Sequence, residues 1–539
     1  MASEGQKNKT FVRGAVILGI AGLTIKLLGA AFRIPLTNII GDDGMGYYQT
    51  AYPIYVLFLT IATAGIPTAI SRMVAERNAV DQPYEAHRVF RLSFLLLLAV
   101  GLTSSSILYF GAERITALIQ EPEAVHAMKA IAPALFFVPL MASFRGYFQG
   151  RQNMTPTAAS QVIEQLFRVA VGLGLAVYLL PKGLQYAAAG ASFGATAGGI
   201  FGFAGILILY LFNHKEIAAD LAGADRTPRE TTRSILWGLL VIAVPITIGA
   251  SIMPIINAID TAIVKSRLID IGYDSALARG LYGQLTGMAA PLINFPQVLT
   301  QAVAMSLVPV VASAHRRREL TFMRGNIALG LRFALLLSIP CAIGMTVLAR
   351  PIMLLLYPLQ KESAINAASC LAILSVGIVF LATVQTLTGV LQGVGKQLIP
   401  VRNLFLGALV KIAVTYVLTG IPSINVRGAA LGTVAAYLVA AGLNLMAVRK
   451  YTQTRIDGNL TFVKPLFSAA VMGIAVIIVH WAGVGPMGNS LSTILSIVVG
   501  IAVYFYMILA TKAISAQEIA LMPRGDRLVR WMEKRKDVR

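Results

Sequence analysis

The chain has 539 residues, of which 57% are hydrophobic and 13% are charged. This composition is typical of a polytopic membrane protein and excludes an ordinary soluble domain. Lys and Arg number 45 against 24 Asp and Glu, so the formal net charge is +21. Most of this excess lies in loops between apolar segments, and it therefore does not indicate nucleic acid as a partner. Cys341 and Cys370 lie in apolar segments without metal-ligand spacing, so no metal site is predicted.

The first apolar segment, residues 11–40, is long enough to cross a bilayer and carries two cations well inside it, Lys26 and Arg33. Three glycines share their helical face, because Gly19, Gly22, Lys26, Gly29 and Arg33 recur at steps of three and four. A cation at mid-membrane costs at least about 3 kcal/mol and normally faces a wet cavity or a partner. The segment contains no Asp or Glu. We therefore expect both cations to line a cavity for an anion, with snorkelling to the membrane surface as the alternative.

Windows of about 20 apolar residues predict about fourteen membrane spans. Every second loop is rich in Lys and Arg, which places these loops and both termini in the cytoplasm. The basic clusters are Arg72, Arg77, Arg88 and Arg91; Lys215, Arg226, Arg229 and Arg233; Arg316, Arg317, Arg318 and Arg324; and Arg449, Lys450, Arg455 and Lys464. The basic tail is expected to lie on anionic lipid headgroups.

The chain repeats itself in its second half. Four residues of spans four and five recur with the same residue or another cation at a constant offset of 243: Gly146, Gln149, Gly150 and Arg168 map onto Gly389, Gln392, Gly393 and Lys411. The motif that begins at Gly190 is also similar to the one that begins at Gly428. Internal repeats are typical of transporters, whose substrate site lies at the repeat interface.

The predicted fold is therefore all-α, with two six-helix lobes and two additional helices. The predicted parts are an N-terminal lobe (1–213), a cytoplasmic linker (214–232), a C-terminal lobe (233–450), spans 13 and 14 (451–513) and a basic tail (514–539).

Further candidate site residues lie inside later predicted spans: three cations and the acid Asp260. Lys411 lies mid-span and is a candidate anion ligand, as are Arg145 and Arg168. For Arg145 the alternative is snorkelling. For Arg168 a salt bridge to Glu164 at i, i−4 is the favoured single explanation. Asp260 either balances cavity cations or couples transport to an ion, or it caps its helix.

Several motifs of the sequence resemble those of a known family. Residues 24–33, followed by Ile39, Ile40 and Gly41, are similar to the first helix of MurJ-type lipid II flippases of the YtgP/SpoVB branch, in the MOP superfamily. Residues 294–297 and 306–309 resemble span eight of that family. The resemblance implies a V-shaped pair of lobes around a central cationic cavity, with a groove for a polyprenyl tail at the last two helices. It also implies that Lys26 and Arg33 contact a pyrophosphate head group.

The sequence departs from the family pattern at several positions. The first of the two basic residues is Lys rather than Arg, one extra residue separates the pair, and Gly46 or Tyr47 stands where an acid is expected. Some members bind sodium, and the matching candidates are Asn257, Asp260 and Asn403. Gly407 stands where a second acid is expected, which argues against sodium coupling.

The prediction is a transporter, not an enzyme, that flips a lipid-linked cell-wall precursor, with lipid II as the first choice. The alternatives are another polyprenyl-linked glycan (teichoic acid, capsule or spore cortex) and a multidrug–cation antiporter of the same superfamily. No cofactor is expected, and the driving force is a monovalent cation or the membrane potential. The expected location is the bacterial plasma membrane. The expected partners are the lipid-linked oligosaccharide, anionic lipids and cell-wall synthesis or division proteins, with the chain as a monomer.

Overall fold

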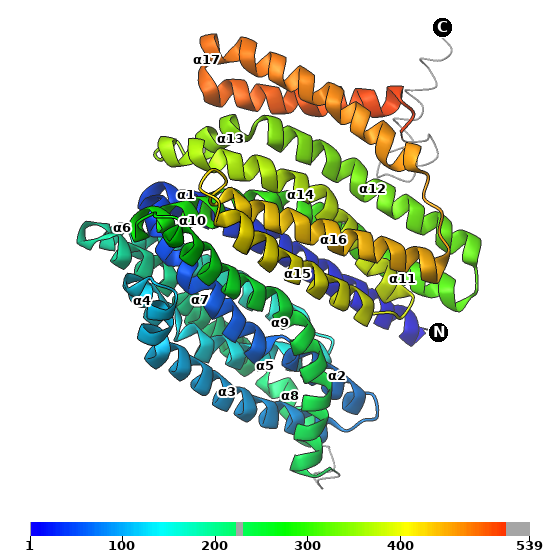
Figure 1. The fold of residues 1–539 in the computed structure, drawn as a ribbon. Helices are drawn as coiled ribbons and strands as arrows, with labels where there is room; N and C mark the ends of the chain where they lie inside the picture. Colours follow the sequence, from blue (N-terminus) through cyan, green and yellow to red (C-terminus); the bar gives the residue numbers. More distant parts are fainter. Residues whose placement is uncertain (1, 223–229, 514–539) are drawn as a thin grey trace. The chain divides into compact units, whose positions relative to one another are not determined.

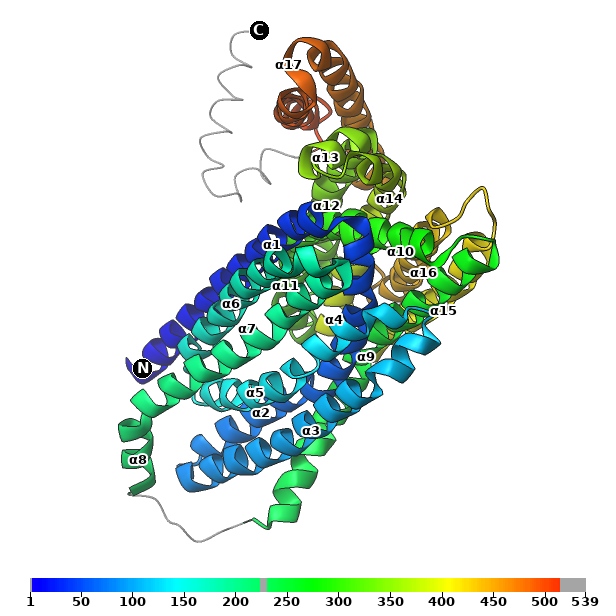
Figure 2. The same cartoon turned by 90° about the vertical axis from the view of Figure 1, so that its left-hand side faces the viewer.

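The computed structural model of the protein describes residues 2–222 and 230–513. The predicted basic tail, 514–539, lies outside the described residues. Within them the chain is built from helices joined by short turns, without strands, as shown in Figures 1 and 2. The all-α prediction is confirmed.

The helices fall into two compact units. One unit contains Met1–Met288 with Tyr416–Val426, and the other contains Ala289–Thr415 with Arg427–Arg539. The helices of the first unit are α1 (Ala2–Thr63), α2 (Ile66–Asn78), α3 (Pro83–Leu118), α4 (Val125–Ile131), α5 (Ala134–Gly150), α6 (Thr155–Leu179), α7 (Leu184–Phe212), α8 (His214–Ala222), α9 (Thr232–Asp270) and α10 (Ser275–Gly283). The remaining helices are α11 (Ala290–Arg316), α12 (Leu320–Val347), α13 (Ala349–Leu356), α14 (Lys361–Gly393), α15 (Leu398–Thr419), α16 (Arg427–Thr452) and α17 (Lys464–Ala510).

Twelve segments of the described chain are long and apolar enough to cross a membrane. Two of them contain a break at a glycine with positive φ: Gly41 (φ 70°, ψ −174°) within α1 and Gly488 (φ 71°, ψ 173°) within α17. Only glycine adopts this backbone region readily. Each break divides one continuous helix into two spans, which accounts for the fourteen predicted. The division by packing groups α9 and α10 with the first six spans, and the lobe boundaries predicted from the repeat stay a prediction.

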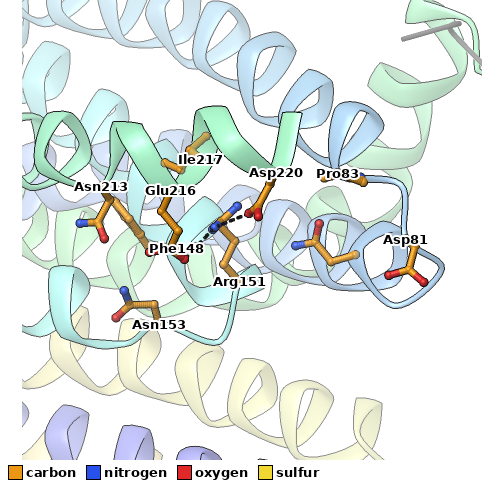
Figure 3. Close-up of a pocket in the computed structure, with 10 residues that line it drawn as sticks. Asp81, Pro83, Phe148, Arg151, Asn153, Asn213, Glu216, Ile217 and Asp220 are labelled. Atoms are coloured by element: carbon orange, nitrogen blue, oxygen red, sulfur yellow. Dashed lines mark hydrogen bonds and ion pairs between the residues drawn. The ribbon is translucent and has the colours of Figure 1, made fainter. Parts of the chain in front are cut away.

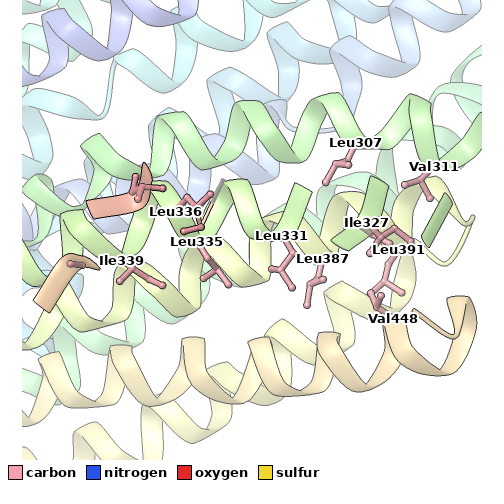
Figure 4. Packing of buried hydrophobic residues seen from close by; sticks show 14 of the residues in the cluster. Leu307, Val311, Ile327, Leu331, Leu335, Leu336, Ile339, Leu387, Leu391 and Val448 are labelled. Atoms are coloured by element: carbon pink, nitrogen blue, oxygen red, sulfur yellow. The ribbon is translucent and has the colours of Figure 1, made fainter. Parts of the chain in front are cut away.

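Apolar side chains fill the interior of the second unit. Leu307 and Val311 of α11 belong to one buried cluster with Leu331 and Leu335 of α12, and all four are at most 6% exposed (Figure 4). Leu391 of α14 belongs to the same cluster. Lipid tails are as apolar as leucine, so helices in a membrane associate through close packing and small residues rather than through the hydrophobic effect.

Glycines provide this close packing at matched places in the two halves. Gly150 of α5 faces α2, and Gly393 of α14 faces α11. A side chain added at Gly150 would meet the backbone oxygen of Ser71 and the side chain of Val74. A side chain added at Gly393 would meet the backbone oxygen of Val308 and the side chain of Val311. One turn earlier, Gly146 and Gly389 face the backbone oxygens of Pro67 and Ala304. The contacted residues differ by a constant 237, so the predicted internal repeat is confirmed in the packing.

Candidate functional site

The break at Gly41 returns the chain upon itself, so that Arg33 contacts the second half of α1. The guanidinium carbon of Arg33 lies 5.6 Å from the centroid of the Tyr52 ring. In one straight helix the two residues would be roughly 28 Å apart along the axis. The break is therefore what brings this cation to the aromatic ring.

A second guanidinium, from α6, reaches the same ring. The guanidinium carbon of Arg168 lies 5.4 Å from the Tyr52 centroid. The Nη2 atom of Arg168 is buried and has no hydrogen-bond partner. Helices α1, α6 and α7 lie alongside one another (Figure 2), which allows α6 to place Arg168 opposite α1. Cations within about 6 Å of a tyrosine centroid are attracted to the ring face.

Arg33 and Arg168 form no ion pair with any residue in the described part of the chain. Lys26 lies on the same helix two turns before Arg33 and is exposed. The structure thus brings Arg33 and Arg168 to the same ring, that of Tyr52. The role of the two arginines as anion ligands stays a prediction. Tyr52 was missed from the sequence, although three tyrosines at positions 48, 52 and 55 share one face of a helix.

The predicted pairing of Glu164 with Arg168 is wrong. Glu164 Oε2 accepts from Nη2 of Arg145 at 2.9 Å, and Nε of Arg145 donates to Oγ of Ser160 at 2.9 Å. The side chains of Arg145 and Glu164 are 13% and 20% exposed. Arg145 is therefore tied across the α5–α6 turn to α6 rather than extended to the membrane surface.

Lys411 occupies in α15 the place that Arg168 occupies in α6. A side chain added at Gly194 of α7 would meet the backbone oxygen of Arg168 and the backbone nitrogen of Gly172. A side chain added at Gly432 of α16 would likewise meet the backbone oxygen of Lys411 and the backbone nitrogen of Thr415. Lys411 itself is buried, with 7% of its surface exposed. The repeat thus gives each half one cation at the same position in its pair of packed helices.

The predicted ion-coupling residues lie on two helices. Asn257 is exposed and Asp260 partly buried on α9, whereas Asn403 is buried on α15. The amide nitrogen of Asn403 donates to Oδ1 of Asn444 at 2.9 Å, and Asn444 in turn lies 3.4 Å from Thr388. Within the described residues no group of three His, Cys, Asp or Glu side chains could hold a metal ion. Ion coupling stays a prediction.

A buried charged cluster near the ends of α9 and α10 was missed by sequence reasoning. Nζ of Lys265 lies 3.1 Å from Oε2 of Glu121 and 2.5 Å from Oγ1 of Thr50. Nη1 of Arg279 donates to the other oxygen of Glu121 at 3.0 Å, and its Nε lies 3.5 Å from Asp43. The side chains of Lys265 and Glu121 are only 2% and 4% exposed. The cluster ties α9 and α10 to the turn after α3 and to α1.

A polar cavity of about 340 Å³ lies among the connections after α2, α5 and α7. Figure 3 shows Arg151 at its wall, with Nη2 2.9 Å from Asp220 and 3.3 Å from Glu216 of α8. The cavity is open, and Arg151 is already paired with two of its carboxylates, Glu216 and Asp220. These ion pairs fix α8 to the α5–α6 connection.

The chain matches known proteins over most of its length. The family model described as polysaccharide biosynthesis protein matches residues 11–315, and the MatE model matches residues 285–417. A membrane protein of Bacillus subtilis (strain 168), YabM, is 29% identical over 99% of this chain and 98% of its own. The lipid II flippase MurJ of the same organism is 26% identical over 92% of this chain and 94% of its own. A solved structure of lipid II flippase MurJ in an inward closed conformation shares the fold, with a TM-score of 0.67, 16% identity and coverage of 91% of this chain and 98% of that chain.

These matches confirm the resemblance found in the sequence and the transporter fold. They also confirm that the chain is a multi-pass membrane transporter and not an enzyme.

Proposed function

Because the chain belongs to the polysaccharide biosynthesis protein family, we propose that it is a flippase for lipid II, the lipid-linked precursor of peptidoglycan. The observation that carries the proposal is the pair of guanidiniums, Arg33 and Arg168, which share the ring of Tyr52 and form no ion pair with a carboxylate of the described residues. The relative named lipid II flippase MurJ supports the choice of substrate.

The chemistry of the head group requires such a site. A pyrophosphate with about two negative charges cannot enter hydrocarbon without its water, unless protein cations replace that water. Arg33 and Arg168 supply guanidiniums, which bind phosphate oxygens through two parallel hydrogen bonds. Lys26 and Lys411 are the further ligands of the proposal. The polyprenyl tail stays in lipid throughout.

The protein would work in the bacterial plasma membrane with both termini in the cytoplasm. It binds the head group from the cytoplasmic leaflet, changes from an inward-facing to an outward-facing state, and releases the head group outside. An inside-negative potential favours the return of an empty cationic site to the inward-facing state.

The MatE match leaves a multidrug–cation antiporter as the second candidate. Such a protein needs membrane-embedded carboxylates to attract cationic drugs, whereas the first span offers cations. The charge of the site therefore favours an anionic substrate.

The test is depletion of the protein in its source bacterium, with other flippases deleted, followed by labelling of lipid II at the outer surface. We expect outer-surface lipid II to fall while the cytoplasmic pool rises. A variant with both Lys26→Ala and Arg33→Ala should insert normally and fail to complement. Arg72→Ala, at an exposed arginine paired with Glu76, is the matched control and should complement. Unchanged lipid II at the surface would refute the substrate, and export of a teichoic-acid or capsule precursor would support that glycan instead.

A further inference from the structure

The ring of Tyr52 contacts two cations that come from different helices. We propose that Tyr52 is a positioning residue, which holds Arg33 and Arg168 in one register so that both bind the phosphate groups of a single lipid head. This inference rests on the proposed function. It adds a residue that contacts the two arginines rather than the lipid head group itself.

The distances support a shared anchor. The guanidinium carbons lie 5.6 Å and 5.4 Å from one ring centroid, so their separation cannot exceed the sum of these two distances. The ring is fixed on both sides by aromatic neighbours on the same helix. Tyr48 stacks on it with centroids 5.5 Å apart, and Tyr55 follows at 6.0 Å. Both neighbours are 2% exposed, so the ladder is part of the packed interior.

An aromatic anchor suits an anion site better than a carboxylate. Two guanidiniums close together repel each other, and some group must offset this repulsion in the empty site. A carboxylate would do so, but it would also neutralise the cations and compete with phosphate for their N–H groups. A ring face attracts the cations through its quadrupole and leaves their charge and their N–H donors available.

The arrangement belongs to the first half of the chain alone. By the constant offset of 237, the positions that correspond to Tyr48, Tyr52 and Tyr55 are Leu285, Ala289 and Leu292. The packing of the two halves is repeated, but the aromatic ladder is not. Packing between repeats therefore does not explain the three tyrosines.

The test measures binding of geranylgeranyl diphosphate and geranylgeranyl monophosphate to the full-length protein purified in detergent. We expect the wild type to prefer the diphosphate. Tyr52→Phe keeps the ring and should bind both lipids as the wild type does. Tyr52→Leu should lose about tenfold in affinity for the diphosphate and most of its preference over the monophosphate. Tyr416→Leu is the matched control, because Tyr416 is an exposed tyrosine with Arg267 at 4.5 Å from its ring, and binding should not change.

A double-mutant cycle separates positioning from a general structural effect. In an Arg168→Gln background, Tyr52→Leu should cost clearly less affinity than it does in the wild type, because its partner is already gone. Strictly additive losses, or a Tyr52→Leu protein with unchanged affinity and preference, would overturn the proposal. Tyr52→Met repeats the test if the leucine variant does not fold. A wild type that binds neither lipid refutes the head-group site itself, which is a different result from a silent Tyr52.

Discussion

The buried cluster around Glu121 gives the most direct test of the structure. Glu121 is 4% exposed and accepts from Lys265 at 3.1 Å and from Arg279 at 3.0 Å. The substitution Glu121→Gln keeps the size of the side chain and removes its charge. Lys265, whose side chain is only 2% exposed, then keeps Thr50 as its hydrogen-bond partner in this cluster but loses its carboxylate.

The expected loss is large because the charge that remains has no access to water. Removal of one partner from a buried ion pair costs about 3–5 kcal/mol, most of it the cost of the uncompensated charge. Arg279 loses less, since it is also 3.5 Å from Asp43, whose side chain is 42% exposed. We therefore expect Glu121→Gln to lower the free energy of unfolding by about 3 kcal/mol.

Thermal unfolding of the purified protein in detergent measures this loss. The control is Glu76→Gln, which breaks the ion pair of Glu76 with Arg72 at 2.8 Å, where the side chains are 54% and 65% exposed. Exposed pairs contribute about 0–1 kcal/mol, so the control should melt close to the wild type. The double variant Glu121→Gln with Lys265→Met should regain much of the loss, because it removes both charges. Equal melting of Glu121→Gln and the control, or a double variant no more stable than the single one, would refute the buried pair.

Three further predictions concern packing and local geometry. Gly393→Ala should lower the melting temperature, at a cost of about 1–3 kcal/mol for overpacking, whereas Gly442→Ala, with nothing within 4 Å, should not. Gly41→Ala forces a side chain into a backbone region of φ 70° at a cost of about 1–3 kcal/mol, and equal complementation by this variant would show that the break is not needed. Arg145→Ala should destabilise the protein because it leaves the partly buried Glu164 without its ion-pair partner, and Arg145→Ala with Glu164→Gln should recover stability, as measured by melting.

The sequence predicted the helices because their signals are local. An apolar segment that ends at Ile40 is followed by Gly41, and the structure has its break there. The repeat was also visible, since glycines that pack helices together cannot be replaced by larger residues without a clash.

Side-chain partners could not be predicted in the same way. The spacing of Glu164 and Arg168 suits a salt bridge on one helix, but the partner of Glu164 is Arg145, 19 residues away across a turn. The partners of Glu121 lie 144 and 158 residues away, and no spacing rule connects them. Tyr52 was missed for a related reason, because a tyrosine in a span is ordinarily a packing residue until the break at Gly41 places a cation on its ring.

The two halves share their packing but differ in the chemistry of one polar network. In the first half Arg145 binds Ser160 and Glu164, whereas the equivalent positions in the second half are Thr388, Asn403 and Gly407. The second half therefore has two neutral polar residues and a glycine where the first half has a charged network. The neighbouring position has kept a cation, as Arg168 in one half and Lys411 in the other. A cation at this position in both halves agrees with the proposed role toward an anion, and Lys411→Gln should therefore reduce complementation.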